Sequence, residues 1–202
     1  MMSSTSSSTE KEALRQSLRE KLAAQPTTDA REAAEAIHRQ VLALPEVREA
    51  SGLLVCLSFG HEVDTWALVD QLLSNATQRI GGQQIYVPRA ERRGHRLAVH
   101  PYPCPLETLS FGLQQPPRNT PALPSDAIDQ HIDVALILGL GFDHRGIRLG
   151  YGAGFFDRFL AGRPFPAIGL AYALQVVETL PADAHDIPMS VVVTEEEVIR
   201  PA

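Results

Sequence analysis

The sequence has few of the residues that hold together small secreted proteins and metal-binding modules. Its 202 residues include only two cysteines, Cys56 and Cys104. They have neither the spacing of a metal site nor the number needed for a disulfide framework. Such sparse cysteine use is typical of proteins in a reducing compartment, so we expect a cytoplasmic location.

Long apolar runs and an excess of basic residues are also missing. No apolar segment approaches the roughly 20 residues that a helix needs to cross a bilayer, so we expect no membrane insertion. The net charge is −6, whereas nucleic-acid-binding proteins usually have a basic surface, so nucleic acid is not an expected partner. A local group of basic residues can still bind a small anion.

The beginning of the chain differs in composition from the rest. Residues 1–9 are rich in Ser and Thr and lack the apolar stretch of a signal peptide. We expect residues 1–8 to be a disordered tail. No long linker divides residues 9–202, and the whole sequence is 44% apolar and 21% charged, as in ordinary soluble proteins. We therefore expect one domain over residues 9–202. We also expect the protein to be a monomer.

Helical and strand patterns alternate along that domain. Leu14, Leu18 and Leu22 form one apolar stripe, which predicts a first helix that begins near a capping box at Thr9–Glu12 and ends before Pro26. Similar reasoning predicts further helices over residues 29–44, 65–76 and 153–162. Short apolar runs predict strands over residues 52–58, 83–89, 96–102, 133–139, 166–172 and 190–194.

This order predicts the architecture. Strands that alternate with helices form a mostly parallel sheet covered by helices on both faces, so the fold class is α/β. Residues 96–102 alternate best and fit an antiparallel or edge strand. Residues 103–131 are rich in Pro and polar groups. We expect a long surface loop there, and loops of that length are often functional.

A glycine-rich turn within residues 139–160 contains the most informative pattern. Gly150, Gly152 and Gly154 alternate between a buried strand and a helix. Glycine lets a ligand approach the main chain. The exposed N–H groups of such a turn form an anion site, to which Arg148 adds a guanidinium that can bind two phosphate oxygens.

The spacing alone leaves alternatives open. G-x-G-x-G is neither the dinucleotide fingerprint nor a P-loop, so a phosphate cradle and a plain tight turn are about equally consistent with it. Asp157, three residues after the last glycine, has the chemistry of a Mg²⁺ ligand. It is also what a first helical turn prefers for its dipole.

Six segments together resemble the 5-formyltetrahydrofolate cyclo-ligase family. IRLGYGAGFFDRFL resembles that family's signature R-L-G-x-G-x-G-[YF]-Y-D, and KEALR resembles its K-x-x-x-R. HEVDT, IYVPR, LGLGFD and AHDIPMSVVVTE resemble further family segments in the same order. The resemblance covers nearly the whole chain beyond the tail.

The resemblance implies a fold related to the ribose-phosphate isomerase and CoA-transferase group. It also implies a reaction in which 5-formyltetrahydrofolate and ATP give 5,10-methenyltetrahydrofolate, ADP and phosphate, with Mg²⁺. Phosphorylation turns the formyl oxygen into a good leaving group, and N10 of the folate then closes the ring. Such a transfer needs positioning and charge neutralisation more than a protein nucleophile.

The resemblance also implies which residues bind ATP. Lys11 and Arg15 match a basic pair that reaches the phosphates, and their spacing of four places them on one helix face. Arg148 and Lys11 are the expected catalytic residues. Apart from the family match, Lys11 and Arg15 also fit a solvated helix surface. The full implied ATP site is Lys11, Arg15, Arg148, Leu149, Gly150, Tyr151, Gly152, Ala153, Gly154, Phe155 and Phe156.

The folate and metal sites follow from the same matches. Glu62 matches a substrate-binding acid at a strand end, where α/β sheets place ligands, and its other interpretation is a loop carboxylate. Asp157 and Asp186 match Mg²⁺ carboxylates, although Asp186 also fits a turn before Ile-Pro. The implied folate site is Leu57, Glu62, Tyr151, Gly152, Ala153, Gly154 and Phe155, in which Leu57 also fits a core position.

The sequence departs from the family pattern at three positions. Phe156 replaces a usual Tyr, Ala153 replaces a Lys found in some members, and Leu138 replaces a common Pro. Two other functions remain open. One is a sugar-phosphate isomerase or acyl-CoA transferase, which would not need the Lys11 and Arg15 pair. The other is a non-catalytic folate- or nucleotide-binding protein, which only the Phe156 change favours.

Overall fold

The computed structural model describes residues 3–78, 82–91 and 93–201. Within these residues, seven strands form the central sheet in the order β12-β11-β9-β6-β1-β2-β3. The pairs between β11, β9, β6, β1 and β2 are parallel, and the edge strands β12 and β3 are antiparallel. The strands are β1 (Gly52–Val55), β2 (Gln84–Glu91), β3 (Arg96–Tyr102), β6 (Val134–Leu138), β9 (Ala167–Leu170), β11 (Val191–Val193) and β12 (Val198–Ile199).

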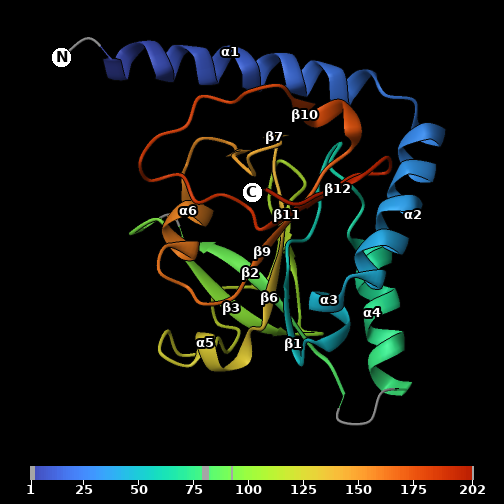
Figure 1. The fold of residues 1–202 in the computed structure, drawn as a ribbon. Helices are drawn as coiled ribbons and strands as arrows, with labels where there is room; N and C mark the ends of the chain where they lie inside the picture. The colour runs from blue at the N-terminus through green and yellow to red at the C-terminus, as the bar shows by residue number, and fades with distance from the viewer. Residues whose placement is uncertain (1–2, 79–81, 92, 202) are drawn as a thin grey trace.

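The central strands of the sheet lie in the hydrophobic core. Every residue of β1, β6, β9 and β11 is buried, because each of these strands lies between layers of helices and loops. Figure 1 shows α2 (Thr27–Ala43) and α4 (Trp66–Gln78) on one side of the sheet, and α5 (Ile128–His131) and α6 (Phe155–Leu160) towards the other. The predicted α/β class, with one mostly parallel sheet between helices, is confirmed.

Helix α1 (Ser3–Ala24) crosses one end of the molecule (Figure 1). Leu18 and Leu22 of its predicted stripe are buried. The helix begins at Ser3, earlier than the capping box at Thr9 suggested. The disorder predicted for residues 1–8 and the domain boundary at residue 9 stay predictions. None of the helices within the described residues is both long and apolar enough to cross a bilayer.

The region predicted as one long loop, residues 103–131, has short elements. It contains β4 (Glu107–Thr108), β5 (Gln114–Gln115) and α5. We call residues 107–115, which form the β4–β5 hairpin, the flap. A five-residue helix, α3 (Pro45–Glu49), begins at Pro45, where the sequence indicated only the end of α2. Pro fits the first turn of a helix, which explains how one helix ends and another begins there.

A second small sheet separates β6 from the glycine-rich turn. It consists of β10 (Val176–Val177), β7 (Gly141–Asp143) and β8 (Arg148–Leu149). The turn therefore follows β8 and not β6 directly, which corrects the prediction. The backbone nevertheless returns to the end of β6, because Leu140 N donates to Leu149 O at 2.8 Å. Helix α6 begins at Phe155, two residues later than expected.

The buried carboxylate of Asp143 fixes this hairpin. It accepts hydrogen bonds from the backbone N–H groups of Arg145, Ile147 and Leu180 at 2.9, 3.1 and 3.0 Å. Burial opposes its ionisation, but these bonds and the Arg145 side chain outweigh burial and lower the pKa of Asp143. The carboxylate thus holds β7 and β8 together at the strand that carries Arg148.

Candidate active site

A cavity of about 1430 Å³ opens at the carboxyl ends of the parallel strands. Leu57 follows β1, Pro88 and Arg89 lie near the end of β2, and Leu138 ends β6. This is where α/β sheets bind ligands. All the predicted site residues line the cavity, namely Lys11, Arg15, Leu57, Glu62, Arg148, Leu149, Gly150, Tyr151, Gly152, Ala153, Gly154, Phe155, Phe156, Asp157 and Asp186.

Helix α1 contributes its two predicted cations to the cavity. Lys11 Nζ donates to Asp183 Oδ2 and Asp186 Oδ2, both at 2.7 Å. Burial disfavours the charge of Lys11, but these two bonds outweigh it and raise the pKa of the amine. Arg15 Nε donates to Gly150 O at 2.9 Å. Both residues therefore reach across the molecule to the loops that form the site.

The glycine-rich turn has backbone conformations that explain its sequence. Gly152 has a φ of 100° and Gly154 a φ of 62°, and both values lie in the left-handed region that favours glycine. A side chain at Gly150 would meet Arg148 Nη1 at 2.7 Å. Glycine at these positions keeps the turn compact and leaves the backbone open to a ligand.

Arg148 is a buried cation with weak partners. Its side chain is only 4% exposed, and its Nη2 lies 3.3 and 3.4 Å from the two carboxylate oxygens of Asp157. Its Nε has no hydrogen-bond partner among the described residues. Its guanidinium lies 5.4 Å from the ring centre of Phe156. That stacking needs only the ring, so the missing tyrosine hydroxyl does not affect it.

Asp157 and Asp186 approach the same part of the cavity. Asp157 Oδ1 accepts a long hydrogen bond, 3.5 Å, from the backbone N–H of Ile187, the neighbour of Asp186. Asp186 comes from the segment that precedes β11. No group of three metal-ligating side chains occurs among the described residues. Two carboxylates nevertheless suit Mg²⁺, which takes its other ligands from phosphates and water.

Glu62 connects the β1 end of the cavity with the glycine-rich turn. Its Oε1 accepts from the Tyr151 hydroxyl at 2.9 Å, and its Oε2 accepts from the backbone N–H of Phe59 at 3.0 Å. Burial raises the pKa of Glu62 to about 7, and these two bonds and the charge of Arg148 offset only part of that effect. The carboxyl group therefore titrates near neutral pH.

This pKa gives a first prediction on stability. Glu62 binds its proton more tightly in the folded state, where the pKa is about 7, than in the unfolded state, where it is 4.5. The free energy of unfolding should therefore fall by about 3 kcal/mol as pH rises through this window. Denaturant titrations from about pH 4 to 8 should show a smaller fall in Glu62→Gln than in the wild type. Parallel curves for the two proteins would contradict the shift.

Several cavity residues were not found from the sequence. Phe59 packs against Tyr151 and against Phe111 of the flap, with ring centres 5.4 and 5.6 Å apart. Asp183 joins Asp186 on Lys11. The only signal for Phe111 was the prediction that the long loop is functional. The spacing of Asp183 and Asp186 is visible in the sequence, but nothing there indicates that both contact Lys11.

A comparison with protein families agrees with this geometry. The 5-formyltetrahydrofolate cyclo-ligase family matches residues 7–195. The chain belongs to this family. Its resemblance to the family, predicted from six sequence segments, is therefore confirmed over nearly the full length. The chain is accordingly an enzyme of the cyclo-ligase family, and not a sugar-phosphate isomerase or an acyl-CoA transferase.

Individual relatives support the family membership. The 5-formyltetrahydrofolate cyclo-ligase of Haemophilus influenzae is 30% identical over 165 residues, which cover 78% of this chain and 83% of the relative. That of Mycolicibacterium smegmatis is 34% identical over 74% of this chain and 77% of the relative. The 5,10-methenyltetrahydrofolate synthetase structure from Aquifex aeolicus matches with a TM-score of 0.77 and 28% identity, over 94% of this chain and 92% of the other.

Proposed function

We propose that this cyclo-ligase converts 5-formyltetrahydrofolate to 5,10-methenyltetrahydrofolate with the use of ATP. The observation that carries the proposal is the buried Arg148 guanidinium. It faces the cavity beside a glycine-rich turn, and its partners among the described residues are weak or missing. Such a cation is prepared for an anionic ligand, and a phosphate is the ligand that it fits best. The proposed location is the cytoplasm.

The ATP phosphates would lie between α1 and the glycine-rich turn. Lys11 and Arg15 approach this space from α1, and Arg148 approaches it from β8. In the structure, Lys11 pairs with Asp183 and Asp186. We infer that Lys11 turns to the phosphate on binding, because Mg²⁺ that arrives with the nucleotide would compete with Lys11 for the Asp186 carboxylate.

Mg²⁺ is part of this proposal, and the donor set fits it. Asp157 and Asp186 would hold the ion together with phosphate oxygens and water. When bound, the ion would neutralise phosphate charge. Release of Lys11 by Asp186 would leave that carboxylate available for the ion. The basic residues and the carboxylates therefore suit a complex of ATP with Mg²⁺ better than either ligand alone.

The folate would occupy the other part of the cavity. Glu62 and Leu57 lie at the end of β1, and Phe59 and Phe111 add aromatic faces that suit a flat ring. A ring amine or N–H of the pterin can donate to the Glu62 carboxylate in a charge-assisted hydrogen bond. The turn Tyr151–Phe155 lies between the two ligands, so the formyl group and the γ-phosphate would meet there.

The reaction then needs two bond exchanges. The formyl oxygen attacks the γ-phosphorus, and the bond to the ADP oxygen breaks. N10 next attacks the formyl carbon and loses its proton, and phosphate leaves with the former formyl oxygen. Arg148 and Lys11 would stabilise the charge that gathers on the transferred group, which is the main catalytic requirement of phosphoryl transfer.

A labelled formyl group tests this sequence of steps. We expect ¹⁸O placed in the formyl group to appear in inorganic phosphate, at one label for each methenyl product. Mass spectrometry of the phosphate measures the transfer. A control reaction in ¹⁸O-water with unlabelled folate should leave the phosphate unlabelled. Label found in water instead of phosphate would contradict the phosphorylated intermediate.

A further inference from the structure

Two arginines at the rim of the cavity have no part in the proposed chemistry. Arg93 lies in the turn between β2 and β3, and Arg118 lies in the segment after β5. Both are exposed and line the cavity. Neither has a hydrogen-bond or ion-pair partner within the part of the chain that the structure describes. In a chain with a net charge of −6, this local positive charge favours an anionic ligand.

Contacts at the end of β2 hold the two segments near each other. Arg89 Nη1 donates to Pro116 O at 2.8 Å. Arg93 follows Arg89 by four residues, and Arg118 follows Pro116 by two, so both cavity-lining arginines come from segments that this contact joins. We call Arg93 and Arg118 the rim arginines.

The rim keeps a positive charge despite nearby carboxylates. Glu91 and Glu107 also line this part of the cavity. Glu107 Oε1 already pairs with Arg89 Nη1 at 2.6 Å, and Arg89 shields that charge. The charges left at the rim are then one carboxylate, Glu91, and the two rim arginines. The rim therefore has an excess of one positive charge.

The order of the strands separates this rim from the nucleotide groups. Arg148 contacts Leu138 O at the end of β6, in the middle of the sheet. Glu62 belongs to the loop after β1, the next strand outward. Arg93 lies in the turn between β2 and the edge strand β3, and the segment after Arg118 joins β3 through the hydrogen bond from Leu123 N to Val99 O. From the centre to the edge of the sheet, the cavity thus presents first the residue proposed to bind phosphate, then the residue proposed to bind the pterin, and then the rim arginines.

We propose that Arg93 and Arg118 bind the carboxylates at the glutamate end of the folate substrate. This inference rests on the proposed function. With the pterin at Glu62 and the phosphates at Arg148, the rim arginines are the cations of the cavity lining that remain for the anionic end of the substrate. A guanidinium pairs with a carboxylate through two parallel hydrogen bonds. Further γ-linked glutamates would add carboxylates along the same rim.

The test compares two substrates and two proteins. The double variant Arg93→Gln/Arg118→Gln is assayed with 5-formyltetrahydrofolate and with 5-formyltetrahydropteroate, which lacks the glutamate. We expect the variant to raise KM for the complete substrate about fivefold to tenfold, as two partly exposed ion pairs would. KM for the truncated substrate and KM for ATP should stay unchanged, because neither ligand reaches the rim. The two proteins and two substrates form a thermodynamic cycle. If the arginines bind the glutamate, the effect of removing the arginines and the effect of removing the glutamate should not be additive.

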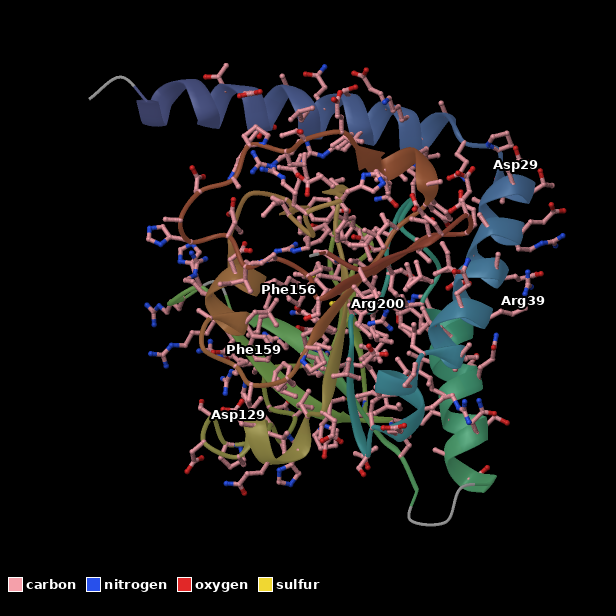
Figure 2. The ribbon with its side chains drawn as sticks, viewed as in Figure 1. Asp29, Arg39, Asp129, Phe156, Phe159 and Arg200 are labelled. Atoms are coloured by element: carbon pink, nitrogen blue, oxygen red, sulfur yellow. The ribbon has the colours of Figure 1, made fainter. Side chains whose placement is uncertain are left out.

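A matched control removes an arginine elsewhere. Arg39 is exposed on α2, and Figure 2 shows its side chain on the outer side of that helix. Arg39→Gln changes the net charge without touching the cavity, and we expect it to leave both substrates unaffected. Equal effects of this variant and of the rim variants would overturn the proposal, because they would show a general effect of charge.

Dissociation constants measured by calorimetry without ATP make the result independent of turnover. A wild-type preference for the complete substrate that disappears in the double variant supports the proposal. A preference that persists in the variant overturns it, and so does a variant whose only defect is weaker ATP binding, since the rim would then serve the nucleotide. Wild-type protein that binds folate but forms no methenyl product would contradict only the proposed function.

Discussion

Arg148→Ala is expected to lower kcat/KM for ATP by about 10²–10³, which is the usual effect of removing a buried group that stabilises transition-state charge. The physical reason is the position of the guanidinium. It is 4% exposed, lies beside the glycine-rich turn and has only long contacts with Asp157. Its loss also leaves Asp157 with a negative charge next to the phosphates. KM for folate should change much less.

Initial rates with each substrate varied in turn provide the measurement. Arg163→Ala is a matched control, because Arg163 also pairs with an aspartate, Asp129, and also lies over an aromatic ring, Phe159. Arg163 does not line the cavity of about 1430 Å³. Lys11→Ala should resemble Arg148→Ala in lowering kcat/KM for ATP. Unchanged ATP kinetics in both variants would contradict the nucleotide assignment.

Glu62→Gln is expected to weaken folate binding by about 10- to 150-fold, which corresponds to the 1.5–3 kcal/mol of a hydrogen bond to a charged group. The amide has the size of the carboxyl group and can still accept from Phe59 N–H. It cannot carry the negative charge that a pterin N–H would pair with. ATP binding should change little, because the Lys11, Arg15 and Arg148 contacts remain.

The measurement is calorimetric titration of each ligand at about pH 8, where Glu62 is mostly ionised, since its pKa is about 7. Glu46→Gln serves as the control, because Glu46 forms an ion pair with Arg200 and does not line the cavity. A folate affinity that is unaltered in Glu62→Gln would return this residue to the role of a loop carboxylate.

The strands and long helices were predictable because local patterns determine them. The continuous apolar run of β6 indicates a buried strand, and the alternation of β3 indicates an antiparallel or edge strand. Both strands formed where expected. The short β7–β8 hairpin was not predictable in this way. It depends on Asp143, which binds backbone groups as distant in sequence as Leu180. A pattern read over a few neighbouring residues contains no information on such a contact.

The residues of the site also differ in whether a local sequence pattern identifies them. Residues in the family's motifs could be identified from the sequence, and the structure brings Lys11 and Asp186 together across 175 positions. Phe111 could not be identified, because only the folded flap brings it to Phe59. The raised pKa of Glu62 also depends on burial by distant segments. The roles of these residues stay predictions until variants are measured.

The most direct measurement follows the methenyl product by its absorbance while ATP is varied. With 5-formyltetrahydrofolate present, we expect the absorbance to grow only when ATP is added, and one ADP to appear for each methenyl group formed. Wild-type protein and Arg148→Ala should differ by about 10²–10³ in this assay. Product formed at the same rate without ATP, or ATP consumed without product, would contradict the account.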